Sequence, residues 1–185
     1  VLWVDRGTPK SKKKADEDDE AEDAFNLYED IKTKLVLAGI KADEIAFIQD
    51  HDNPKKKIEL FRQLNNSEKR IIIASTQSLS VGANIQQHLT AAHHLDAPWR
   101  PADVEQRDGR IIRPGNRAQE IEIYRYVTEK TFDAFMWQTL ALKWGFLQDF
   151  YKGDTGVQEL EDVGEAVMTP EEMLAMATGD ERIAR

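Results

Sequence analysis

The residues best suited to chemistry lie in the run from Gln106 to Gly115, which reads Gln-Arg-Asp-Gly-Arg-Ile-Ile-Arg-Pro-Gly. Arg110 and Arg113 are three residues apart, so we expect both guanidinium groups to lie on one face of a helix and to reach one target. A planar, permanently charged group suits a polyphosphate, where it neutralises the charge that develops during phosphoryl transfer. The alternative is an arginine-rich surface helix held in salt bridges with its acidic neighbours.

A second polar stretch lies upstream, directly after an apolar run that is predicted to be a buried strand. It begins with Ser75-Thr76 and continues to Gly82-Ala83-Asn84-Ile85. Hydroxyl groups at the carboxyl end of a parallel strand, followed by a glycine that permits close approach of the backbone, are typical of a phosphate or nucleotide site. Taken alone, the stretch also fits an ordinary connection between a strand and a turn.

A third stretch, His93 to Pro101, is predicted to be a strand that ends in Asp96 and leads through Trp99-Arg100-Pro101 to the arginine run. In this order, the three stretches resemble motifs of the carboxyl-terminal RecA-like lobe of superfamily 2 helicases, above all those of the Swi/Snf-type branch. There the fifth motif contains Ser-Thr and then Gly-x-Asn-Leu, a strand ending in Asp precedes Trp-x-Pro, and the sixth motif reads Gln-x-x-Gly-Arg-x-x-Arg-x-Gly-Gln. The resemblance covers roughly residues 1–150.

A narrower resemblance covers most of the chain, including its acidic tail. The opening Val1-Leu2-Trp3-Val4-Asp5 and the later stretch from Tyr124 to Asp133 are similar to the helicase segment of phage and mobile-element proteins that join an adenine-specific DNA methylase to a helicase. Two positions depart from the Swi/Snf pattern: Arg107 follows Gln106 where remodelling ATPases often carry a small residue, and Asn116 replaces the terminal Gln. These departures leave the ATP role intact but count against a remodeller.

The resemblance implies a role for each residue on the nucleotide side. Arg113 matches the principal arginine finger on the γ-phosphate, and Arg110 matches its companion. Gln106 matches the residue that couples the nucleotide to the state of the motor. Gly82 and Asn84 match positions of the fifth motif that lie at the nucleotide.

On the nucleic-acid side, Thr76 matches the hydroxyl that contacts the backbone of the nucleic acid in related helicases, and Ser75 precedes it. Trp99, between Pro98 and Arg100, is the tryptophan best placed for a functional contact with a base. The chain is therefore expected to be the second motor lobe of an ATP-dependent DNA helicase or translocase. Its expected partners are double- or single-stranded DNA and an amino-terminal RecA-like lobe.

Two motifs of a complete motor are missing from the 185 residues. The sequence has no Gly-x-x-x-x-Gly-Lys followed by Ser or Thr, and no Asp-Glu-x-His. A phosphate cradle and a magnesium site are needed before arginine fingers can act. We therefore expect ATP and Mg²⁺ to bind only together with the absent lobe, and the fragment alone to be inactive although its parent is an ATP hydrolase.

The elements that must position these residues alternate along the chain. The predicted strands are Val1–Val4, Ile45–Ile48, Arg70–Ala74, Ala92–Leu95 and Ile121–Val127. The predicted helices are Ala24–Ala38, Asn53–Leu64, Pro101–Ile112 and Thr131–Tyr151. Asn53-Pro54 is typical of a helix start, and Gly39 of a helix end. Short apolar strands that alternate with crossover helices predict an α/β fold, and with the resemblance a RecA-like parallel sheet flanked by helices.

Charge divides the chain into regions. The formal net charge is −9, but residues 24–153 carry only +1, because seven acids lie in Asp16–Asp23 and nine in Asp154–Arg185. We expect a RecA-like domain over 1–152, with a charged insertion at 10–23, and an acidic helical appendage over 153–185. The apolar start without Met indicates a fragment cut at a strand. The absence of cysteine excludes a disulfide scaffold and fits a cytoplasmic protein, and no apolar run is long enough to span a membrane.

Other functions fit the sequence less well. A degenerate helicase-like module that binds protein or DNA without catalysis is the main alternative, and the intact arginine pair counts against it. A Rossmann-like enzyme needs Gly-x-Gly-x-x-Gly after the first strand, where the chain has Asp5-Arg6-Gly7-Thr8-Pro9. No metal site is expected, because the four histidines lack a metal-binding spacing and the adjacent pair His93-His94 points to opposite faces of a strand.

Overall fold

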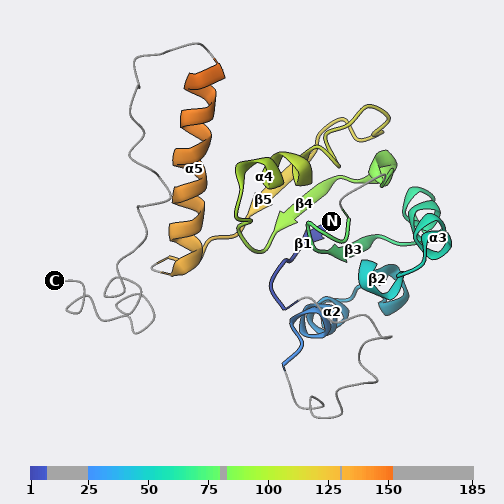
Figure 1. The fold of residues 1–185 in the computed structure, drawn as a ribbon. Helices are drawn as coiled ribbons and strands as arrows, with labels where there is room; N and C mark the ends of the chain where they lie inside the picture. Colours follow the sequence, from blue (N-terminus) through green and yellow to red (C-terminus); the bar gives the residue numbers. More distant parts are fainter. Residues whose placement is uncertain (8–24, 80–82, 130, 152–185) are drawn as a thin grey trace. The chain divides into compact units, whose positions relative to one another are not determined.

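A computed structural model describes residues 1–7, 25–79, 83–129 and 131–151 of the chain (Figure 1). The chain divides into two compact units. The first comprises Val1–Asp96 and Val104–Tyr126, and the second comprises Ala97–Asp103 and Val127–Arg185. The predicted boundary between residues 152 and 153 falls at the end of the described residues, so this boundary, the appendage beyond it and the whole charged insertion at 10–23 stay predictions.

The first unit is built on a five-stranded sheet in which every pair of neighbouring strands is parallel. The strands are β1 (Leu2–Trp3), β2 (Ile45–Phe47), β3 (Ile71–Ala74), β4 (Ala91–His94) and β5 (Glu122–Arg125), in the order β2-β3-β1-β4-β5. Each lies within one residue or a few of a strand predicted from the sequence. The predicted α/β class with a parallel sheet is confirmed.

The helices also follow the sequence. They are α2 (Leu27–Leu37), α3 (Pro54–Asn65), α4 (Pro101–Asp108) and α5 (Phe132–Tyr151), with short 3-10 turns at Ala42–Glu44, Ile48–Asp50 and Gln86–His88. Asn53 is the N-cap of α3, as predicted, and its side chain accepts a hydrogen bond from the main-chain N–H of Lys55 at 2.8 Å. Gly39 follows α2 with a φ of +96°, a conformation that glycine adopts without steric cost.

Helix α4 ends four residues before the predicted end at Ile112, so the prediction that Arg110 and Arg113 share one face of a helix is wrong. Gly109 follows the helix directly, and glycine is among the poorest helix formers. The main-chain N–H groups of the next two residues bond three residues back instead of four. This tighter turn accompanies the complete burial of the Ile111 side chain in the core, which the helical pattern did not reveal.

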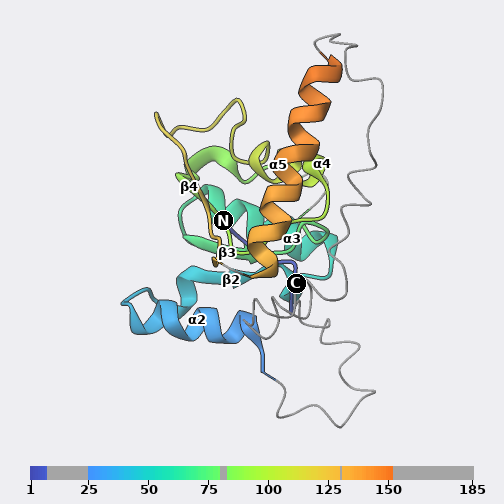
Figure 2. The ribbon, with the colours of Figure 1, turned by 90° about the vertical axis from the view of Figure 1, so that its left-hand side faces the viewer.

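Two apolar clusters cover the two faces of the sheet, because alternate residues of a strand point to opposite faces. In β3, Ile72 belongs to the cluster that contains Leu60 of α3, whereas Ile73 belongs to the cluster that contains Tyr28 of α2. Helices α2 and α3 therefore pack on opposite faces of β2 and β3 (Figure 2). The Tyr28 hydroxyl also donates a hydrogen bond to the main-chain oxygen of Val4, which fixes α2 against the end of β1.

In the second unit, α5 is the longest helix that the structure describes. Met136 and Leu140 are buried, whereas Leu142 and Tyr151 are exposed. The Thr131 hydroxyl donates a hydrogen bond to the main-chain oxygen of Thr128 just before the helix begins. Among the described residues, no helix combines the length and the apolar character needed to cross a membrane.

The cap of α3 gives the first testable prediction. Asn53→Ala removes the acceptor for the Lys55 N–H and should lower the free energy of unfolding by about 1 kcal/mol. Asn53→Asp keeps an oxygen at the same place and should be close to neutral. Chemical denaturation of both variants measures the difference, and an equal loss in both would show that the cap is not what stabilises this helix.

Candidate functional site

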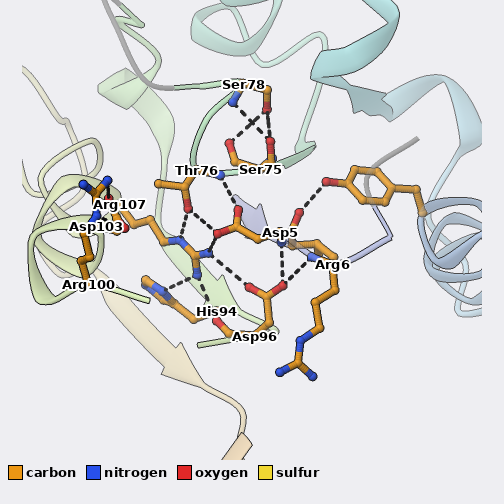
Figure 3. Close-up of polar contacts among 12 residues, drawn as sticks. Asp5, Arg6, Ser75, Thr76, Ser78, His94, Asp96, Arg100, Asp103 and Arg107 are labelled. Atoms are coloured by element: carbon orange, nitrogen blue, oxygen red, sulfur yellow. Dashed lines mark hydrogen bonds and ion pairs between the residues drawn. The ribbon is translucent and has the colours of Figure 1, made fainter. Parts of the chain in front are cut away.

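Polar residues follow three neighbouring strands at the same edge of the sheet (Figure 3). Asp5 follows β1, Thr76 follows β3 and Asp96 follows β4. They come together because the carboxyl ends of parallel strands all lie at one edge. Arg107 of α4 reaches this edge and contacts all three residues, and we refer to these four as the Arg107 cluster.

The Arg107 side chain is completely buried, and each of its three guanidinium nitrogens has a hydrogen-bond acceptor. Nη2 lies 2.7 Å from Oδ2 of Asp5 and 3.2 Å from Oδ1 of Asp96, and Nε donates to the Thr76 hydroxyl at 2.8 Å. Nη1 donates to the main-chain oxygen of Asp96 at 3.0 Å, and the guanidinium lies 5.7 Å from the centre of the Trp3 ring. A buried cation is tolerated only with such complete pairing, because taking an ion out of water costs several kcal/mol.

Asp96 holds the backbone at the end of β1 as well as the arginine. Its Oδ2 accepts hydrogen bonds from the main-chain N–H groups of Asp5, at 2.6 Å, and Arg6, at 2.9 Å. Its carboxylate is almost fully buried. Charge-assisted bonds of this kind are among the stronger ones in proteins, so Asp96 locks the turn after β1 to the end of β4.

His94 connects the cluster, through Asp108, to the outermost strand β5. The ring is fully buried, with Nδ1 3.4 Å from Arg107 Nη1 and Nε2 2.8 Å from Oδ1 of Asp108. Because a guanidinium can only donate and a carboxylate can only accept, the proton of the neutral ring belongs on Nε2. The other oxygen of Asp108 accepts from Nη2 of Arg125 on β5 at 2.7 Å.

Ser75 and Thr76, predicted to contact nucleic acid, form the start of a tight turn. Ser75 is buried, and its hydroxyl lies 2.9 Å from the hydroxyl of Ser78, whose main-chain N–H also bonds back to Ser75 at 3.2 Å. The Ser75 hydroxyl thus stabilises the turn itself. Thr76 is only partly buried, and both its hydroxyl and its main-chain N–H donate to Asp5.

Helix α3 holds the segment after β3 at two points. Near its start, the Lys57 ammonium donates to the main-chain oxygen of Ser78 at 3.3 Å. At its end, the Asn65 side chain donates to the main-chain oxygen of Asn84 at 2.7 Å and accepts from the N–H of Gln87 at 3.3 Å. One helix therefore fixes both the turn that carries Thr76 and the residue predicted to lie at the nucleotide.

The predicted nucleotide residues Arg113 and Asn84 are brought together by the fold. Arg113 is exposed, and its Nη1 donates to Oδ1 of Asn84 at 3.0 Å. Arg110 is partly buried, and burial, followed by the charge of Arg113, lowers its pKa from the usual value. The two guanidinium groups thus repel each other electrostatically, although they do not lie on a common helix. Gln106 is partly buried on α4, next to Arg107.

Gly82 and Trp99 are the two remaining predicted residues. Gly82 falls in 80–82, outside the described residues, so its predicted place at the nucleotide stays untested. Trp99 belongs to the second unit, where its side chain is 67% exposed. This exposure leaves the ring accessible for the contact predicted from the sequence.

The sequence-based reading missed Arg107, Asp5 and His94 as members of the site. The signal that could have found them is the pair of aspartates that end two adjacent parallel strands, since two carboxylates at one buried edge require a cation. Within the described part of the chain, no three His, Cys, Asp or Glu side chains are grouped as a metal site requires.

The Arg107 cluster gives the second prediction. Arg107→Met leaves two carboxylates without their cation and should lower the free energy of unfolding by about 3–5 kcal/mol. The matched control is Arg125→Met, which removes an arginine 43% exposed in its pair with Asp108 and should cost less than about 1 kcal/mol. Thermal and chemical denaturation compare the two, and similar losses would show that burial of Arg107 does not set its importance.

Comparison with known proteins connects this geometry to a family. Residues 24–115 match the family model described as "Helicase conserved C-terminal domain". The Defense against restriction protein B of Escherichia phage P1 is 31% identical to this chain over 96 residues. This alignment covers 52% of the chain and only 4% of the phage protein, so the chain spans a small part of that relative.

A solved structure shares the fold. The C-terminal part of the Fun30 ATPase domain matches with a TM-score of 0.52 at 18% identity, over 63% of this chain and 36% of that one. The E. coli DEAD-box protein SrmB, solved with the regulator of ribonuclease activity A, matches with a TM-score of 0.40 at 16% identity, over 67% of this chain and 59% of that one. Residues 24–115 therefore match a helicase conserved C-terminal domain, and the described residues have the fold of a RecA-like helicase carboxyl-terminal lobe.

Proposed function

We propose that this chain is the second motor lobe of an ATP-dependent DNA helicase or translocase of superfamily 2, of the Swi/Snf-like branch. The observation that carries the proposal is the hydrogen bond of 3.0 Å between Arg113 and Asn84. It joins two sequence motifs, separated by 29 residues, at one place on the surface. Arg110 stands close enough for the two charges to interact.

The electrostatics of the arginine pair favour an anionic ligand. Partial burial of Arg110 imposes a cost of desolvation, and the charge of Arg113 repels it; together these lower the Arg110 pKa. A triphosphate between or beside the two groups would offset both effects, because it supplies opposite charge and charge-assisted hydrogen bonds. The pair therefore fits the γ-phosphate end of ATP. Asn84 would hold the Arg113 fork in the orientation that reaches it.

In this proposal the chain contacts ATP, and the metal of ATP is held by another part of the parent protein. Among the residues that the structure describes, no three His, Cys, Asp or Glu side chains are grouped for a metal, and the sequence has neither the phosphate cradle nor the acidic motif of a motor. Mg²⁺ and the attacking water would therefore be held by the amino-terminal RecA-like lobe of the same parent protein. ATP supplies the phosphoanhydride bond whose hydrolysis drives the motor. Arg110 and Arg113 of this chain would stabilise the charge that develops on the γ-phosphate.

DNA is the proposed track of the motor. The turn that carries Ser75 and Thr76 lies at the carboxyl edge of the sheet, and the exposed Trp99 ring offers a face on which a base can stack. Residues 24–153 carry a net charge near +1, so the lobe alone should hold DNA weakly. Similarity to a protein of phage P1 supports a phage or mobile-element origin for the parent.

The third prediction concerns the chain of 185 residues by itself. Purified alone, it should show no DNA-stimulated ATP hydrolysis, because the phosphate cradle and the magnesium ligands belong to the other motor lobe. Phosphate release with and without DNA measures this. Turnover by the isolated chain would overturn the second-lobe assignment, since all catalytic parts would then have to lie within it.

The fourth prediction concerns the arginine finger in the complete parent protein. Arg113→Ala should reduce DNA-stimulated ATP turnover by roughly 10³-fold or more, the scale of a lost arginine finger. Arg113→Lys should not restore it, because an ammonium keeps the charge but loses the planar fork. DNA binding without nucleotide should change little in either variant.

Arg117 provides the matched control for this experiment. It is an exposed arginine on the same segment, and the contact described for it is made by its main-chain N–H to the main-chain oxygen of Gln87. Arg117→Ala should leave turnover within about threefold of wild type. If Arg113→Ala behaves like Arg117→Ala, the arginine pair is a surface feature, and a non-catalytic helicase-like module becomes the better description of the chain.

A further inference from the structure

Three hydrogen-bond donors converge on the carboxylate of Asp5 (Figure 3). The Thr76 N–H donates to Oδ1 at 2.6 Å, the Thr76 hydroxyl donates to Oδ2 at 2.9 Å, and Arg107 Nη2 donates to the same Oδ2 at 2.7 Å. The Asp5 side chain is 36% exposed, whereas that of Arg107 is completely buried. The donors therefore surround an anion that can reach solvent.

The chemistry of the groups fixes the direction of each bond. The Thr76 hydroxyl lies between Arg107 Nε, which can only donate, and the Asp5 carboxylate, which can only accept. It must therefore accept from the arginine and give its single proton to the aspartate. Its main-chain N–H is given to the same carboxylate. Both protons with which Thr76 could hold a phosphate oxygen are thus used by Asp5.

We propose that the Thr76 N–H, the Thr76 hydroxyl and Arg107 Nη2 form an anion site for a backbone phosphate of DNA, and that Asp5 occupies this site as an internal competitor. A carboxylate and a phosphate take the same donors through charged oxygen atoms. The inference rests on the proposed function, in which Thr76 faces DNA. It adds that this contact opens only when the Asp5 carboxylate swings out toward solvent.

Arg107 keeps a charged partner when Asp5 is released. Asp5, Asp96 and Arg107 together carry one negative charge in excess, so loss of the Asp5 contact leaves a balanced pair. Asp96 keeps Arg107 partnered through its carboxylate and its main-chain oxygen. It also holds the main-chain N–H groups of Asp5 and Arg6, so the backbone stays in place while the side chain turns.

The test measures binding of the full chain to a fluorescein-labelled oligo-dT by fluorescence anisotropy at low salt. Asp5→Asn keeps the shape of the side chain and removes its charge, and it should tighten binding by about fivefold, the worth of one net hydrogen bond. Asp5→Ser should give a similar gain. Asp30→Asn is the control for net charge, because it removes one acid from the pair with Lys34 on α2, and it should gain less than about twofold.

Two further measurements identify the site and the ligand: a double variant and a change of the buffer anion. Adding Thr76→Val to Asp5→Asn should abolish the gain, because valine cannot donate. Replacing chloride by inorganic phosphate at equal ionic strength should leave the gain in place; its loss would assign the site to free phosphate and overturn the DNA assignment. Circular dichroism melting verifies that each variant is folded.

Two results would reject the competitor role. In one, folded Asp5→Asn and Asp5→Ser bind the oligonucleotide no more tightly than wild type and only melt earlier, which is the behaviour of a purely structural carboxylate. In the other, no variant binds at any salt concentration. Neither result touches the Arg113 measurement in the parent protein, which decides the motor assignment separately.

Discussion

The buried charge of Arg107 is the constraint on which the rest of the site depends. A guanidinium without access to water must find acceptors, and the chain supplies them from the ends of β1, β3 and β4. This requirement fixes the relative positions of three loops that hydrophobic packing alone would leave free. The apolar core below sets where the strands lie, and the arginine sets how their polar ends meet.

Much of the fold could be predicted because its signals are local. Short apolar strands identify a buried parallel sheet, and Asn53-Pro54 marks the start of α3 through the physics of the first helical turn. The end of α4 could not be predicted in this way. Its helical pattern continues past Gly109, and only the packing of Ile111 into the core reveals that the chain tightens there.

The site too has a part that the sequence predicts and a part that only the structure reveals. The resemblance to helicase motifs predicted that Arg113 and Asn84 both lie at the nucleotide, and the structure brings the two side chains together although the helix predicted before Arg113 is too long. The burial of Arg107 was invisible in the sequence, because an arginine on a helix is usually a surface residue. Its environment follows from contacts with residues up to 102 positions away, which no local pattern encodes.

The two anchors on helix α3 have a mechanical consequence. Lys57 and Asn65 are eight residues apart, which places the points that hold Ser78 and Asn84 about 12 Å from each other along one rod. Both anchors therefore lie on one continuous helix. The turn after β3 and Asn84, which accepts a hydrogen bond from Arg113, are thus supported by the same helix.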